Sequence, residues 1–255
     1  MSFENFDYGA DLAATKSFTR ENPVEGLHLF RLRSLIHLGC CPQVFDGKAK
    51  DPVNFMAAVL ELKEETDVHS ETGDPLTFTL EFPLRDGSKS FLHSKFLPAL
   101  ASKKDLESGA IKSMDDLIGK LGQISLKPSK ATNEDGTPKY MNLDSISAAH
   151  PSLQASIPAL SIAGVGHCRL KDLTVDAIDE LNSYTQVQML MMKSDEWVAG
   201  THPAIPLVEE IRKERPDFAK AKPKDEEKPS GNQQAGDAPA QGDAPPENLQ
   251  TDEEF

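Results

Sequence analysis

The sequence has few cysteines and no long apolar run, and these absences exclude several classes of protein. Three cysteines (Cys40, Cys41 and Cys168) are too few for a disulfide framework, so we expect reduced thiols. No stretch approaches the roughly 18–20 consecutive apolar residues of a membrane-spanning helix. The first residues also lack the basic and apolar regions of a signal peptide. Together these features predict a cytoplasmic protein.

Signatures of catalysis and of metal binding are also missing. The sequence contains no P-loop, no G-x-G-x-x-G, no G-x-S-x-G and no H-E-x-x-H motif. The glycine pair at 164–166 is typical of a turn, and the spacing of His37, Cys40 and Cys41 does not match that of a zinc site. We therefore expect no enzymatic activity, no cofactor and no bound metal.

Basic residues are outnumbered, 27 against 41 acidic ones, and the excess of acid is concentrated at the C-terminus. Residues 225–255 hold nine acids and one base, a net charge of −8, whereas residues 1–224 carry a net charge of −6. Pro, Gly, Gln, Asp and Ala dominate from residue 222 onward, a composition too polar to form a core. We predict a disordered acidic tail over residues 222–255.

The tail closes on Asp252, Glu253, Glu254 and Phe255. An acidic tip that ends in an aromatic residue, behind a β-rich domain, is typical of proteins that coat single-stranded DNA. Such a tail can compete with DNA for a basic groove and can offer its last residues to partner proteins. This arrangement makes DNA binding the first hypothesis to weigh against the rest of the sequence.

Alternating polar and apolar residues predict five strands before residue 148. In the first strand, Phe30, Leu32, Ile36 and Leu38 are expected on one face, with Arg31, Arg33 and His37 on the other. A turn-rich loop is expected from Gly39 to Pro52, and Pro83 suits an edge strand or a bulge. The five predicted strands cover residues 24–39, 53–62, 76–84, 122–127 and 139–146.

Helical spacing over residues 91–106, and a short helix capped at Ser113, lie between the third and fourth strands. Three strands, a helical insertion and two further strands are the order of a five-stranded OB-fold barrel, so the fold class is mainly β with α additions. A generic α+β domain would also accommodate these elements.

The predicted organisation has four parts. They are an N-terminal arm (1–23), the OB-fold core (24–147), an α-containing extension packing on the core (148–221) and the tail (222–255). In the extension, Thr174 is expected to cap one helix and residues 206–215 to form another. Residues 186–197 could be strand or helix.

Binding to single-stranded DNA requires cations for phosphates and aromatic faces for stacked bases. The candidate cations are Arg31 and Arg33 on the first strand, with Lys127 and Lys139 on or beside the last two. The candidate stacking residues are Tyr140 and Phe55, whose strand parity opposes that of their apolar neighbours. Loop lysines such as Lys130 are weaker candidates. The alternative is that all of these are solvated charges and partly buried aromatic residues.

Three parts of the chain resemble phage-encoded single-stranded DNA-binding proteins. They are GLHLFRLRSLIHLG (26–39), DDLIGKLGQISL (115–126) leading to KYMNLDSIS (139–147), and the acidic tail ending in phenylalanine. The resemblance implies an OB-fold and sequence-tolerant DNA binding during phage replication and recombination, in the host cytoplasm. It also implies that the tail contacts replication proteins such as DNA polymerase. A homo-oligomer is compatible with it.

Two other functions are open to the same sequence. One is a structural or protein-interaction module that binds no DNA and uses the tail only for solubility. The other is an accessory protein of a nuclease or a recombination mediator, which would bind DNA but depend on a partner protein for any activity.

Overall fold

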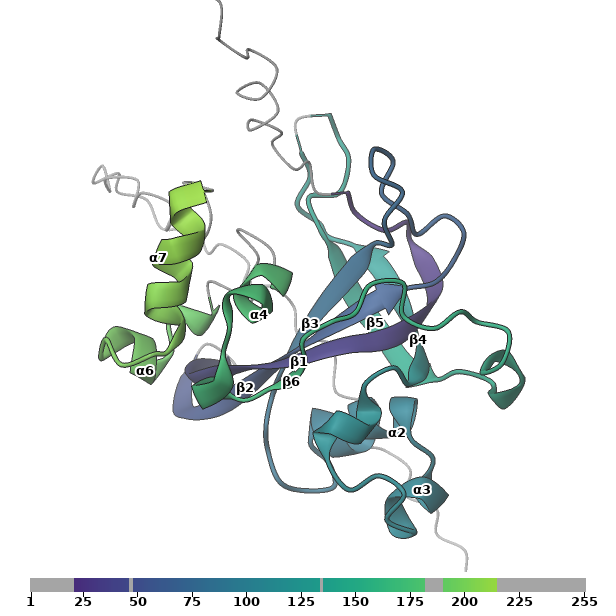
Figure 1. Ribbon diagram of the computed structural model, residues 1–255, viewed down its shortest axis with the longest axis horizontal. Helices are drawn as coiled ribbons and strands as arrows, with labels where there is room; N and C mark the ends of the chain where they lie inside the picture. The colour runs from purple at the N-terminus through teal and green to yellow at the C-terminus, as the bar shows by residue number, and fades with distance from the viewer. Residues whose placement is uncertain (1–20, 46–47, 134, 182–189, 215–255) are drawn as a thin grey trace, which may run out of the picture. The chain divides into compact units, whose positions relative to one another are not determined.

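The computed structural model in Figure 1 describes residues 21–45, 48–133, 135–181 and 190–214. The chain divides into two units, Met1–Lys220 and Ala221–Phe255. The predicted tail and most of the predicted arm lie outside the described residues. The described part of the first unit is mainly β, with short helices, as the sequence predicts.

A single sheet of six strands forms the centre of the fold (Figure 1). Its hydrogen-bonded order is β3-β2-β1-β4-β5, with every neighbour antiparallel, and β6 pairs in parallel with β1 outside this path. The strands are β1 (Gly26–Phe45), β2 (Lys48–Leu62), β3 (Thr77–Pro83), β4 (Leu121–Pro128), β5 (Met141–Ala148) and β6 (Gly166–Cys168). The five predicted strands are confirmed, and β6 adds a strand that begins at Gly166, the second of the two glycines interpreted as a turn.

The first two strands are longer than predicted, and the expected loop from Gly39 to Pro52 is wrong. The residues expected in the loop extend the β1–β2 hairpin instead, because β1 continues to Phe45 and β2 begins at Lys48. Gly39 lies at a register shift that begins at His37, and Pro52 lies at another, where Cys41 pairs with Val53 and Gln43 with Lys50. Bulges absorb residues that a regular ladder excludes, so turn-forming residues here bend a strand instead of ending it.

A further bulge corrects the predicted faces of β1. Leu32 pairs with Leu60 and Ser34 with Val59, which leaves Arg33 as the extra residue. A one-residue slip turns the side chains that follow it, as far as the next register shift, to the opposite face. Phe30 and Leu32 therefore belong to a different core from Ile36 and Leu38, with which the sequence groups them.

The first core lies on the inner face of the sheet. It takes side chains from all five antiparallel strands, including those of both outermost strands, β3 and β5. The insertion between β3 and β4 packs against it through Leu92, Phe96 and Leu100, and the Phe82 and Phe96 rings lie 4.7 Å apart. The insertion consists of η1 (Leu92–Phe96), α2 (Leu97–Leu100), α3 (Lys103–Glu107) and η2 (Met114–Leu117).

Helix caps explain where two of these segments begin. Ser102 and Ser113 each form a capping box. In this motif the serine accepts from the backbone N–H of the aspartate three residues later, and the carboxylate of that aspartate accepts from the serine N–H. The predicted helix start at Ser113 is thus confirmed. Pro83 ends β3, an outermost strand, where its missing N–H breaks no ladder.

The second core covers the other face of β1 and β2 with the C-terminal part of the unit. Ile36, Leu38 and Val59 pack there against α4 and α7. Thr174 caps α4 through the Ala177 N–H, as predicted. The remaining elements are η3 (Pro151–Leu153), η4 (Leu170–Asp172), α4 (Val175–Glu180), α6 (Asp195–Val198) and α7 (Ala204–Glu214). No helix among the described residues has both the length and the apolar character needed to cross a membrane.

A buried histidine links the second core to the sheet. The ring of His202 is 2% exposed, and its Nε2 lies 3.2 Å from the Leu38 carbonyl oxygen. Its Nδ1 accepts from the Ala204 N–H at 3.0 Å, at the start of α7. Both nitrogens are occupied in the neutral ring. Burial lowers the pKa of His202, although the Leu38 carbonyl and the Glu196 charge oppose this.

We therefore expect the free energy of unfolding to fall as the pH drops below about 6.5, because the unfolded chain takes up the His202 proton first. Above this pH the contribution of His202 is constant. One such group accounts for at most about 1.4 kcal/mol per pH unit. Urea denaturation at several values between about pH 5 and about pH 8, which span the ordinary pKa of histidine, would measure how the free energy of unfolding changes with pH.

His202→Asn is the control, because the amide oxygen can still accept from the Ala204 N–H but cannot titrate. The free energy of unfolding of this variant should depend less on pH than that of the wild type. Some dependence should remain, because burial also lowers the pKa of His37. Equal slopes in the two proteins would show that His202 does not carry the effect.

Candidate nucleic-acid interface

Arg31 faces the outside of the sheet, but most of its hydrogen-bonding capacity is used within the chain. Its guanidinium donates to the backbone carbonyls of Gly119, Gln154, Ile157 and Pro158, at 2.8, 3.2, 2.7 and 2.6 Å respectively. These bonds use four of the five donors of an arginine. Arg31 therefore fastens residues 154–162, which we call the strap, onto β1.

The cross-strand partner of Arg31 is Glu61, and this carboxylate holds the other end of the strap. Its oxygens accept from the backbone N–H groups of Ser161, at 2.7 Å, and Ile162, at 3.4 Å. Lys63 pairs with the fully buried Glu61 and donates to the Ala159 carbonyl at 2.7 Å. Burial favours a higher pKa for Glu61, but the Lys63 ammonium and the strap N–H groups outweigh it, so the pKa is lowered.

Arg33 and Phe55 also have roles within the fold. Arg33, the bulged residue of β1, lies 3.5 Å from the carboxylate of Glu180 in α4, and both side chains are mostly buried. Glu180 also accepts from the Val165 N–H at 3.1 Å. Phe55 does face away from Met56, as its parity predicts, but it packs against the second core instead of facing solvent.

Lys127, Lys139 and Tyr140 lie together where β4 joins β5. Lys127 is exposed on the outer face of β4, opposite Asn142, and pairs with Asp144 at 3.0 Å. Tyr140 directly precedes β5, and its side chain is 38% exposed. Lys139 is exposed beside it. The structure therefore brings these three predicted residues together and places Arg31 elsewhere.

The distance to Arg31 follows from the strand register. Arg31 pairs with Leu121, six residues before Lys127 on β4, and at about 3.3 Å per residue this is roughly 20 Å. The strap covers the Arg31 end of the outer face. The Lys127 end carries the exposed residues Asn142 and Asp144 of β5.

The loop that connects β4 to β5 is held by its own backbone. Ser129 donates its N–H to the Tyr140 carbonyl at 2.9 Å and accepts the Tyr140 N–H at its hydroxyl, at 3.3 Å. The Lys139 N–H donates to the Ala131 carbonyl at 2.9 Å, and Thr132 bridges to Pro138. The loop is thus a structured hairpin, and its residues Lys130, Lys139 and Tyr140 are exposed. We call this group, with Lys127, the β4–β5 surface.

A second group of basic residues was missed by the sequence reasoning. His37, His167, Arg169 and Lys171 line one cavity, although about 130 residues separate the first from the others. No sequence spacing could indicate this, because the parallel pairing of β6 with β1 creates it. In the described part of the chain, no three His, Cys, Asp or Glu side chains are placed to hold a metal ion.

Comparison with known proteins supplies no relative. The chain matches no protein-family model, and neither the curated proteins nor the solved structures show a significant similarity to it. The function must therefore be argued from the geometry of these surfaces.

The strap gives a prediction about stability. Glu61→Gln leaves the Lys63 ammonium buried without a counter-charge, and removing one partner of a buried ion pair costs about 3–5 kcal/mol. We expect the free energy of unfolding to fall by about 3 kcal/mol, at the lower end of this range, because the amide oxygen can still accept a hydrogen bond from the strap. Chemical denaturation would measure it.

Asp144→Asn is the matched control, because it removes an acidic partner from the exposed Lys127 pair. That change should cost no more than about 1 kcal/mol. A loss of similar size in the two variants would contradict the role assigned to the buried pair.

Proposed function

We propose that the protein binds single-stranded DNA without sequence preference, through the β4–β5 surface of an OB-fold barrel. The strand order β3-β2-β1-β4-β5 supports the barrel, because it is the order around an OB-fold whose seam lies between β3 and β5. The helical insertion also lies between β3 and β4, as in that fold. Side chains of both seam strands share one core, which supports a curled sheet.

The observation that carries the proposal is the exposed ring of Tyr140 among three exposed lysines. Base stacking on an aromatic ring is tolerant of sequence, because every base has a π-face. Lys127, Lys130 and Lys139 supply the positive charge that follows a phosphate backbone. The loop that carries them connects the fourth and fifth strands, one of the two loops with which OB-folds bind oligonucleotides.

Arg31, Arg33 and Phe55 take no part in the proposed interface, because their polar groups or ring are engaged within the chain. Without Arg31 and Arg33, the proposed interface has few cations, and the chain as a whole carries a net charge of −14. Stacking on Tyr140 therefore carries more of the proposed binding than in a strongly basic protein.

The acidic tail regulates this surface in our proposal. Its net charge of −8 over residues 225–255 can occupy the lysines when DNA is absent. When DNA displaces it, Asp252, Glu253, Glu254 and Phe255 become available to replication proteins such as DNA polymerase. This combination is that of a phage-type single-stranded DNA-binding protein.

Deletion of residues 225–255 should tighten binding to oligo-dT. The gain should be larger at about 50 mM than at about 200 mM salt, because salt screens the competing charge. Fluorescence anisotropy at several salt concentrations would measure it. A tail of equal length with its nine acids changed to Asn and Gln should behave like the deletion, and unchanged affinity in both would remove the competition model.

Tyr140→Ala should weaken binding to oligo-dT by about 1–3 kcal/mol, or roughly 5- to 150-fold, with little change in salt dependence. Lys139→Gln should instead reduce the slope of log affinity against log salt by about 0.7. Tyr140→Phe, which keeps the ring, and Lys104→Gln, an exposed lysine of α3, are the controls.

The same titrations with double-stranded DNA separate stacking from simple charge attraction. Paired bases cannot reach Tyr140, so the duplex should bind more weakly than oligo-dT. Equal binding of the two forms, or no effect of Tyr140→Ala, would contradict the proposed interface and favour a protein-interaction module.

A further inference from the structure

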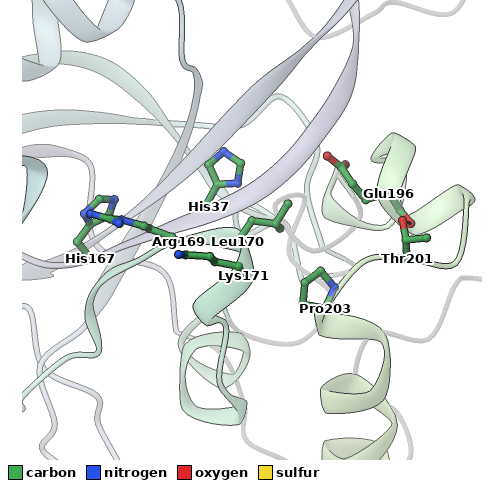
Figure 2. Close-up of a pocket in the computed structure, with 8 residues that line it drawn as sticks. All are labelled: His37, His167, Arg169, Leu170, Lys171, Glu196, Thr201 and Pro203. Carbon is green, nitrogen blue, oxygen red and sulfur yellow. Dashed lines mark hydrogen bonds between the residues drawn. The ribbon is translucent and has the colours of Figure 1, made fainter.

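A cavity of about 470 Å³ lies between β1, β6, η4 and the turn from α6 to α7. Figure 2 shows the Arg169 and Lys171 side chains extending in the same direction, toward His167, while Glu196 and Thr201 form the far wall. The other residues that line it are His37, Leu170 and Pro203.

The parallel pairing of β6 with β1 assembles the cavity. His167 pairs with Leu35, which places it on the same face of the sheet as His37, two residues further along β1. The next residue, Cys168, points the other way into the second core and fixes β6 there. η4 follows at once, so Arg169 and Lys171 stand beside the two histidines.

The basic groups of the cavity are poorly balanced by acids. Arg169 and Lys171 are exposed, and neither forms an ion pair with another residue of the described part. Of the nearby carboxylates, Asp115 lies 3.2 Å from His167, and Glu196 accepts the Cys40 N–H at 2.9 Å. Arg169 and Lys171 thus form no ion pair in the described residues, although the Glu196 carboxylate lines the same cavity.

The His37 ring adds a further polar group without a partner. Its Nδ1 is buried and makes no hydrogen bond within the described residues. Burial lowers the pKa of His37, as do the charges of His202 and His167, while Glu196 raises it. The ring is therefore neutral near pH 7 and can still donate one N–H to an anion.

The size and the lining indicate the class of ligand. Small-molecule sites have volumes of about 300–1,000 Å³, and this cavity lies in that range. Arginine and lysine side chains together are the usual partners of phosphate oxygens. Leu170 and Pro203 add an apolar surface against which a base or a sugar can pack.

We propose that this cavity binds the phosphate of a nucleotide, with Arg169 and Lys171 as its cationic ligands and His37 and His167 as hydrogen-bond donors. The nucleotide is either free or one unit of a DNA strand. The proposal does not depend on the β4–β5 surface, because none of the residues of that surface lines the cavity.

Isothermal titration of the full-length protein with dTMP, inorganic phosphate and thymidine tests the site. We expect dTMP to bind, phosphate to bind more weakly, and thymidine not to bind detectably. The double variant Arg169→Gln/Lys171→Gln should lose at least about tenfold in affinity for dTMP, since two charge-assisted contacts are removed.

Lys104→Gln/Lys112→Gln is the matched control, because it removes the same charge from exposed residues outside the cavity. It should bind dTMP like the wild type. Failure of the wild type to bind dTMP, or equal losses in the two double variants, would overturn the proposal. Thermal unfolding of each variant confirms that it folds.

Titration with oligo-dT identifies the source of the phosphate. If a strand occupies the cavity, oligo-dT displaces dTMP and the Arg169→Gln/Lys171→Gln variant binds the oligonucleotide more weakly. If free nucleotide is the ligand, both bind at once and the variant binds oligo-dT normally. Tyr140→Ala should leave dTMP binding unchanged, so the two proposals can fail separately.

Discussion

The constraint on which the structure depends is that β1 must bury both of its faces. This 20-residue strand pairs with β2, β4 and β6, and its apolar side chains enter two cores. The bulge at Arg33 separates them, with Phe30 and Leu32 before it in the first core and Ile36 and Leu38 after it in the second. The helices of the C-terminal region are needed because the second face would otherwise expose a row of aliphatic side chains.

The same strand explains why several charged residues serve the fold. Arg31 and Glu61 are direct cross-strand partners, and each satisfies backbone groups of the strap that would be costly to bury unpaired. A guanidinium that already donates to four carbonyls has little capacity left for phosphate. Arginines on a strand face are therefore poor indicators of a ligand site when another segment crosses that face.

Two separate cationic regions remain accessible in the described part of the chain. One is the β4–β5 surface, where a structured loop holds Tyr140 beside Lys139. The other is the cavity beside β6, where Arg169 and Lys171 lack acidic partners among the described residues. In a chain with a net charge of −14, such local positive regions are the places where an anionic ligand finds a favourable potential.

The sequence by itself determined most of the secondary structure and the charge of the tail. Strict alternation located β3, β4 and β5, and Thr174 and Ser113 marked helix starts, because these signals act over a few residues. The exposure of Tyr140 also followed from local parity.

Only the tertiary structure decided which face each half of β1 presents, which cations are free, and that His37 meets Arg169. A bulge depends on how two strands pair, and the strap and β6 depend on contacts between residues about 100 or more positions apart. Local periodicity carries no information about such contacts, since their free energy exists only after the chain has folded.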